Sequence, residues 1–122
     1  MKLTIEDPYR IRIAPEIIGS FENDFAYFGV SPSRKDFSVM PVLYMTAFGA
    51  EYDRLDGKRI PANGETRTLF RRFFSHIDAS RIGEGGRIVI PEKVRETFWL
   101  VPGEILEARV VGQRMIISPD VQ

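Results

Sequence analysis

The sequence predicts a mainly β protein with short helices, of the α+β class. Between residues 80 and 91, apolar side chains alternate with other residues on both sides of a glycine-rich turn, which is typical of a β-hairpin. A similar alternation runs through Leu106, Ala108 and Val110 before a second turn at Gly112-Gln113. Between these segments, EKVRETFW has the spacing of a short amphipathic helix. The second half of the chain is therefore predicted to be hairpin, helix, hairpin.

The first of these hairpins places Ile82 before its turn and Ile88 and Ile90 after it. Alternate residues of a strand point to the same face, so these isoleucines are expected to face the core. Pro91 follows at the point where a helix can begin. Its fixed φ suits the first helical turn, and its missing N–H is not needed there.

The helix should bury Val94 and Phe98, which lie four residues apart on one face. Lys93 and Arg95 are expected to stay in solvent. Pro102-Gly103 then ends the helical segment, because this pair favours a turn.

The closing hairpin begins with a strand in which apolar and charged side chains alternate. The two sets are Leu106, Ala108 and Val110 on one side, and Glu107 and Arg109 on the other. Gly112 at the first central position of a two-residue loop suits a type II′ turn. Arg114 to Ser118 is expected to return as the partner strand.

The first half contains a fainter copy of this pattern. LTIEDPYRIRIAPEIIGSF predicts a hairpin followed by a helix, and FAYFGV with DFSVMP predicts a second hairpin. RIRIAPE is similar to RIVIPEK, and Met40-Pro41 echoes Ser118-Pro119. The aligned pairs are Arg10 with Arg87, Ile11 with Ile88, and Ile13 with Ile90. We predict an internal repeat on this basis, with one module in residues 1–60 and a second in 61–122.

Between the copies, the pattern predicts a helix over 42–53, a loop over 57–64 and a second helix over 65–75. The second helix is amphipathic. Its apolar residues are Leu69, Phe70, Phe73 and Phe74, and its basic ones are Arg67, Arg71 and Arg72. We expect the phenylalanines in the core or an oligomer interface and these arginines in solvent or at a subunit contact. The nearby His76 is expected to be structural.

Composition narrows the classes of function. The chain of 122 residues has 17 basic and 17 acidic residues, so no global field draws it to nucleic acid and any such binding must be local. Two modules of this size bury little surface alone, so we expect a homo-oligomer. No apolar run is long enough for a membrane span, and the absence of cysteine fits a cytoplasmic protein.

Catalytic groups are scarce as well. With no cysteine and one histidine, the usual nucleophilic triads and zinc sites cannot form. The Glu-Gly-Gly run at 84–86 is too short for a dinucleotide fingerprint, and it precedes a strand instead of a helix. Paired carboxylates at Glu6-Asp7 lie in a turn where solvated charge is commoner. The sequence thus predicts a protein that is not an enzyme and has no cofactor and no metal site.

The segment SRIGEGGRIVIPEKVRETFWLVPGEILEARVVGQRMIIS resembles the SpoVT/AbrB family module. That pattern combines a Gly-Arg turn, an apolar strand ending in Pro, a short basic helix and a closing hairpin. The resemblance covers about a third of the chain. Two such modules in one chain, with LFRRFFSHIDASRI leading into the second, are similar to the MraZ family of transcriptional regulators. The resemblance implies a swapped-hairpin β-barrel built from two tandem modules.

The MraZ family carries an acidic-x-x-x-Arg turn twice, and this chain departs from it in each copy. The first turn keeps Glu6 and Arg10 but lacks the glycine before the arginine. The second keeps Gly86-Arg87 but has Gly83 where the family has aspartate. By resemblance, the protein is expected to bind double-stranded DNA as a transcription regulator, nucleoid-associated within the cytoplasm.

Arginines of the hairpins are the candidate DNA-binding residues. An arginine on a two-stranded ribbon can donate two hydrogen bonds to guanine in the major groove or neutralise a phosphate. The candidates are Arg87 first, then Arg10, with Arg12 and Arg81 nearer to ordinary solvated residues. In the turn before Arg87, Gly83, Gly85 and Gly86 would permit positive φ and a close approach of the backbone to a phosphate.

Two alternatives stay open. From the pattern alone, the arginines are more often solvated hairpin residues than contacts to a ligand. The whole chain also fits a protein-interaction module, either an antitoxin-like partner binder or a structural barrel whose DNA binding has lapsed. The neutral charge and the altered turns both favour this second function.

Overall fold

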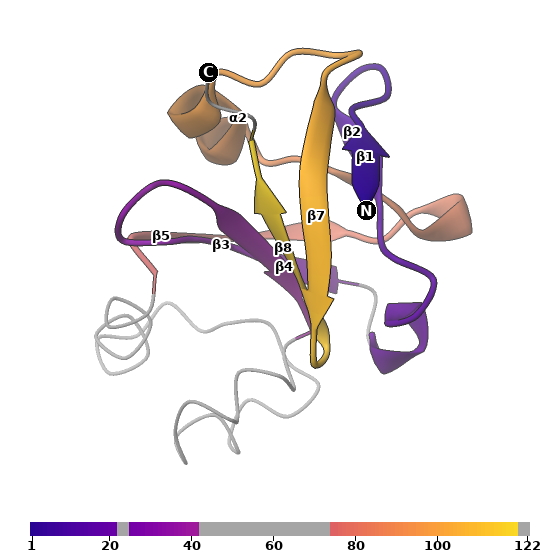
Figure 1. The fold of residues 1–122 in the computed structure, drawn as a ribbon. Coiled ribbons are helices and arrows are strands. Elements are labelled where there is room, and N and C mark those ends of the chain that lie inside the picture. The colour runs from indigo at the N-terminus through magenta and orange to yellow at the C-terminus, as the bar shows by residue number, and fades with distance from the viewer. Residues whose placement is uncertain (22–24, 42–73, 120–122) are drawn as a thin grey trace.

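The computed structural model describes residues 1–21, 25–41 and 74–119, and these form a mainly β fold with short helices, as predicted (Figure 1). The strands are β1 (Lys2–Thr4), β2 (Arg10–Arg12), β3 (Phe25–Val30), β4 (Phe37–Met40), β5 (His76–Arg81), β6 (Arg87–Val89), β7 (Ile105–Val111) and β8 (Arg114–Ser118). Helical residues are α2 (Glu92–Phe98) and the 3-10 turns Ile18–Ser20 and Glu84–Gly86.

The strands pair in two antiparallel sheets. Six form one sheet in the order β1-β7-β8-β4-β3-β5, and β2 pairs with β6 as a separate ribbon. The predicted hairpins β3–β4 and β7–β8 are confirmed. The turn of the latter has Gly112 at φ +62°, as the first central position of a type II′ turn requires.

The other two predicted hairpins are wrong in their partners. β1 pairs with β7 instead of β2, and β5 pairs with β3 instead of β6. The turns themselves survive as isolated bridges, Glu6 with Arg10 and Ile82 with Ile88. The two strands on either side of each turn therefore separate, and each pairs with a strand from the other half of the sequence.

The register of both sheets has twofold symmetry between the two segments that were aligned in the sequence. In the ribbon Ile11 pairs with Ile88, while Arg10 pairs with Val89 and Arg12 with Arg87. Exchanging each residue for its aligned counterpart, 77 positions away, reproduces the same set of pairs. The flanking hydrogen bonds obey the rule too, since N–H of residue 13 donates to the carbonyl of 86 and N–H of residue 90 to that of 9.

The larger sheet has a similar twofold symmetry, in which the counterparts at its centre lie 78 positions apart instead of 77. Its strand order reads alike from both ends when β1 is matched with β5, β7 with β3, and β8 with β4. At the centre, Ser38 pairs with Ile116, flanked by Phe37 with Ile117 and Val39 with Met115. This is the register that a twofold axis between the halves produces. The boundary predicted at residue 60 lies outside the described residues.

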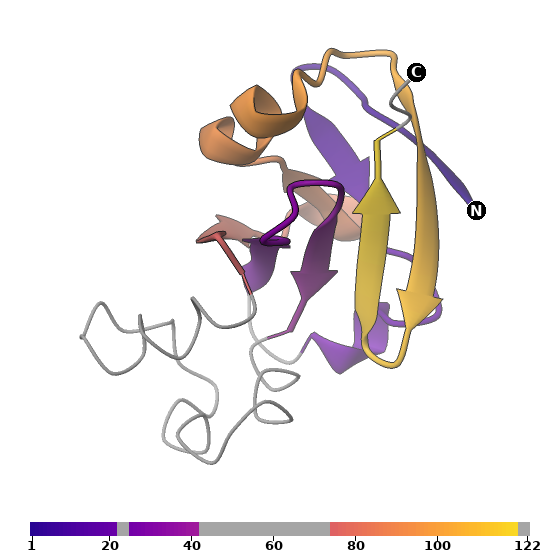
Figure 2. The same ribbon diagram turned by 60° about the vertical axis from the view of Figure 1, so that its left-hand side comes forward.

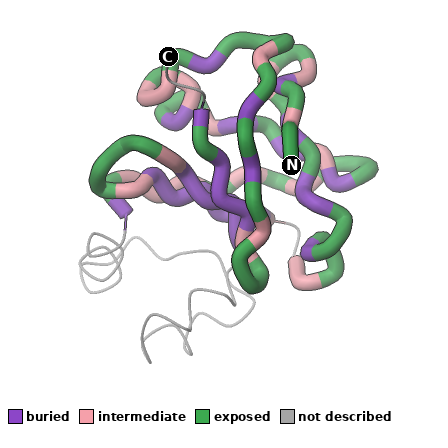
Figure 3. Tube along the Cα trace, in the orientation of Figure 1, coloured by how far each residue is buried: buried purple, intermediate pink, exposed green. Residues whose placement is uncertain are grey.

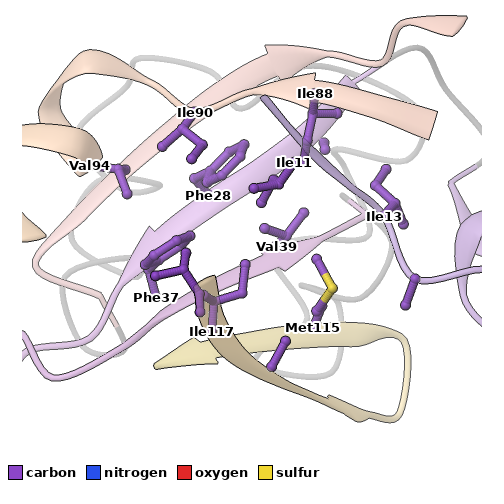
Figure 4. Close-up of a cluster of buried hydrophobic side chains, with 14 of the residues drawn as sticks. Ile11, Ile13, Phe28, Phe37, Val39, Ile88, Ile90, Val94, Met115 and Ile117 are labelled. Atoms are coloured by element: carbon purple, nitrogen blue, oxygen red, sulfur yellow. The ribbon is translucent and has the colours of Figure 1, made fainter. Parts of the chain in front are cut away.

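Buried side chains from both sheets and from α2 form one core (Figures 3 and 4). Ile11 and Ile88 of the ribbon lie with Phe28 and Val39 of the larger sheet, and all four are at most 1% exposed. Burying each such side chain contributes roughly 1.5–3 kcal/mol. Because this core needs both halves of the chain, neither half encloses it alone.

Helix α2 begins directly after Pro91 and ends at Phe98, and the next residue, Trp99, caps it in the left-handed conformation at φ +55°. Val94 is fully buried and the Phe98 ring lies 5.2 Å from that of Phe37, so the predicted apolar face is confirmed. Figures 1 and 2 place α2 at the end of the molecule opposite to the β7–β8 turn. The prediction for Arg95 is wrong, since it is half-buried.

The remaining helix predictions have mixed outcomes. The helix expected after the first ribbon strand is only the 3-10 turn Ile18–Ser20. The helix over 42–53, the loop over 57–64 and most of the helix over 65–75 lie outside the described residues. Phe74 and Ser75 are described and are not helical. Among the described helices, none has the length and apolar character needed to cross a bilayer.

Candidate nucleic-acid interface

The β2–β6 ribbon carries three of the four candidate arginines on one face. Alternation turns Ile11 and Ile88 into the core, where they are 0% and 1% exposed. Arg10, Arg12 and Arg87 consequently point to the opposite face of the ribbon. The sequence alignment of the two segments placed these residues in equivalent strands, and the pairing brings the strands side by side.

Arg12 and Arg87 are direct cross-strand partners, an arrangement in which two like charges repel. Glu6 compensates for both. Its Oε1 accepts a hydrogen bond from Nε of Arg87 at 3.1 Å, and its Oε2 lies 3.4 Å from Nε of Arg12. The Arg87 side chain is 35% exposed and that of Arg12 is 55% exposed. Arg87 is thus available only in part, in contrast to the freely projecting arginine that the sequence suggests.

The hydrogen bond from Arg87 lowers the pKa of Glu6 below its usual value. Partial desolvation acts in the opposite direction, and the charges of Arg87 and Arg12 lower the pKa further. Glu6 is therefore ionised at neutral pH and cancels one of the positive charges of this face.

Arg10 has different surroundings. Its side chain is exposed, and both Nε and Nη2 donate to the carbonyl oxygen of Asp7, at 3.2 and 2.9 Å. This carbonyl fixes the direction of the guanidinium without neutralising it. Among the described residues, no carboxylate lies within ion-pair distance of Arg10.

The glycines next to Arg87 shape the turn. Gly85 and Gly86 have φ of +72° and +76°, so the predicted positive φ is confirmed at these two positions. A side chain on Gly86 would also collide with Cδ1 of Ile18, 2.5 Å from a Cβ placed there. The prediction is wrong for Gly83, which is extended at φ −94°.

Arg81, the fourth candidate, lies in the larger sheet. It ends β5 and pairs with Phe25 of β3, so it does not belong to the outward face of the ribbon. His76, expected to be structural, lies on the same edge strand with its Nε2 3.7 Å from a carboxylate oxygen of Asp78. In the described parts of the chain, no group of three or more metal-ligating side chains comes together.

A second surface feature surrounds the end of α2, and the sequence analysis missed it. The Arg95 guanidinium stacks on the Tyr9 ring, 4.3 Å from its centroid. Beside this pair lies an open depression of about 560 Å³, whose lining includes Glu92, Glu96 and Trp99. Trp99 is 87% exposed. The sequence signal for this exposed aromatic is the pair Phe98-Trp99. Only one of two neighbouring residues can face the core at a helix end, so the other must face solvent.

Comparison with protein-family models finds none that matches the chain, and comparison with curated proteins finds no relative.

Proposed function

We propose that the protein is a DNA-binding transcription regulator that contacts duplex DNA through the outward face of the β2–β6 ribbon. One observation carries the proposal: Arg10, Arg12 and Arg87 project from one face of a two-stranded ribbon whose other face is anchored in the core. Ribbons of this kind fit the major groove, where arginine can bind guanine or phosphate.

The twofold register of the pairing supports a duplicated AbrB-like origin, and we propose two tandem modules that complete a swapped-hairpin barrel. Both ribbon strands then come from equivalent positions, one from each module. An oligomer forms part of the proposal. Each ribbon offers three arginines against Glu6 and the exposed Asp7 and Glu84, so a single copy would bind weakly and several linked copies are needed for useful affinity. A nucleoid-associated location in the cytoplasm would follow from DNA binding.

A gel-shift titration at two salt concentrations tests this function. The full chain is expected to retard duplex fragments, and its affinity should fall as salt rises because bound phosphate releases counterions. The combined Arg10→Ala, Arg12→Ala and Arg87→Ala variant should lose most of the retardation. Arg109→Ala is the matched control, because Arg109 is an exposed arginine on β7, which belongs to the larger sheet and not to the ribbon. Equal retardation by the triple variant and the parent would refute the proposal.

The depression beside α2 favours a second candidate function, a protein-interaction module. Trp99 at 87% exposure, with Val101 and Ile105 each 55% exposed, is an unusual amount of apolar surface for seven consecutive residues. The acids Glu92 and Glu96 line the same depression, so a peptide with a basic side chain next to an apolar one is the complementary partner. This function predicts that Trp99→Ala abolishes partner capture while leaving any DNA retardation unchanged.

A further inference from the structure

The two turns that lead into Arg10 and Arg87 are closed by equivalent backbone hydrogen bonds. N–H of Glu6 donates to the carbonyl of Arg10 at 2.8 Å, and N–H of Gly83 donates to the carbonyl of Arg87 at 2.7 Å. The twofold register of the ribbon relates these bonds to each other, since it relates Arg10 to Arg87 and position 6 to position 83. The closing bonds and the register are thus symmetric, whereas the inner residues of the turns differ, with a cis bond between Asp7 and Pro8 in the first turn and positive φ at Gly85 and Gly86 in the second. The side chains at positions 6 and 83 differ as well.

The acid of the first turn neutralises the arginine of the second strand. Glu6 reaches Arg87 at 3.1 Å across the ribbon. By the symmetry of the register, a carboxylate at position 83 would reach Arg10 in the same way. Position 83 is glycine, so this second ion pair cannot form. Within the described part of the chain, Arg10 donates its side-chain hydrogen bonds to the carbonyl of Asp7 and to no carboxylate.

We infer that the two strands of the ribbon are unequal in anion binding. Arg10 accepts a DNA phosphate, whereas the ion pair with Glu6 prevents Arg87 from doing so. This inference rests on the proposed function for the identity of the anion. A phosphate can approach Arg10 without displacing a carboxylate. At Arg87 it would have to break an existing hydrogen bond and approach a second negative charge. The inequality is the reverse of the order in which the sequence ranks these two arginines.

Fluorescence anisotropy with a labelled duplex, over a series of salt concentrations, separates the two arginines. Arg10→Ala should weaken binding and lower the slope of log affinity against log salt by about one unit per protomer. Arg87→Ala should change both quantities little. Glu6→Gln should raise the affinity and steepen the slope, because it removes the carboxylate that pairs with Arg87. Arg109→Ala controls for the loss of an exposed arginine elsewhere.

The sharper test moves the acid from one turn to the other. Gly83→Glu should place a carboxylate against Arg10 and reduce DNA binding as Arg10→Ala does. Gly83→Ala controls for the added Cβ. That Cβ would lie 3.2 Å from the carbonyl oxygen of Arg87, so the backbone must shift by a few tenths of an ångström, and the alanine variant measures the effect of this shift alone. In the double variant Glu6→Gln and Gly83→Glu, Arg87→Ala should become the damaging substitution and Arg10→Ala the mild one. Circular dichroism of each variant verifies that it is folded.

Chemical modification gives an answer that does not depend on DNA. Phenylglyoxal reacts with accessible arginine side chains, and peptide mass spectrometry can follow residues 10 and 87 separately. Arg10 should react faster than Arg87 in the parent, and Glu6→Gln should bring the two rates together. Equal rates in the parent, or greater damage from Arg87→Ala than from Arg10→Ala, would overturn the inequality while leaving DNA binding intact. Unequal rates in a protein that retards no DNA would instead overturn the proposed function.

Discussion

The burial of one ribbon face can be tested by substituting neighbouring residues on opposite sides of β6. Ile88 is 1% exposed and its cross-strand partner Ile11 is 0% exposed, whereas the adjacent Val89 is 45% exposed. Ile88→Val removes one buried methylene group, which is worth about 0.8 kcal/mol of transfer free energy. With the cavity that remains, the expected loss in free energy of unfolding is about 0.5–1.5 kcal/mol.

Val89→Thr is the matched control, because it keeps a β-branched side chain of the same shape in the same strand. It should change the free energy of unfolding by less than about 0.5 kcal/mol, as surface substitutions usually do. Urea unfolding followed by far-ultraviolet circular dichroism measures both variants. Ile11→Val should behave like Ile88→Val, and the double variant should show a coupling energy because the two side chains meet across the ribbon.

The opposite ranking would refute the assignment of faces. If Val89→Thr were more destabilising than Ile88→Val, the side with Val89 would be the buried one. The three arginines would then not be on the outside of the ribbon, and the proposed DNA interface would have no basis.

Three further predictions concern packing, exposure and charge. Gly29→Ala should lower the free energy of unfolding in urea by about 1–3 kcal/mol, because its Cβ would lie 2.5 Å from Cδ1 of Phe74. Adding Phe74→Leu should recover part of this loss. If Gly29→Ala caused no loss, the ring would lie elsewhere. Trp99, the single tryptophan of the chain, should emit as a solvated indole and shift little on unfolding, so a blue-shifted native spectrum would place it in an interface. Glu6→Gln should lower the urea midpoint at neutral pH. The hydrogen bond from Arg87 depresses the pKa of Glu6 below its ordinary value of 4.5, so the difference in urea midpoint should be fully present above pH 4.5. It should vanish as the pH falls through the depressed pKa. A difference that persists in strong acid would contradict the ion pair.

Much of the local structure could be predicted because it depends on neighbouring residues. The alternation of Leu106 and Ala108 with charged residues predicts the inward face of β7, and Gly112 predicts the turn after it. Pro91 likewise predicts the start of α2. In each case the physical cause acts within a few residues, through side-chain alternation or restricted φ, and the sequence displays it directly.

Pairing partners could not be predicted in the same way. The turns around Glu6 and Gly83 resemble those of hairpins, yet the strands on either side pair with strands from the other half of the chain. A strand with one apolar face can satisfy its backbone hydrogen bonds with several neighbours of the same pattern. The choice among them depends on which arrangement encloses the shared core.

The sequence by itself determined the class of the fold, the inward positions of its strands and the arginines that face outward, because each follows from the alternation of side chains along one strand. The tertiary structure alone decided which charges meet. Glu6 and Arg87 are 81 positions apart, and only the antiparallel pairing of β2 with β6 brings them to 3.1 Å. Coulomb attraction and hydrogen bonding depend on distance in space, so the difference between a neutralised Arg87 and an exposed Arg10 cannot be seen in the order of residues.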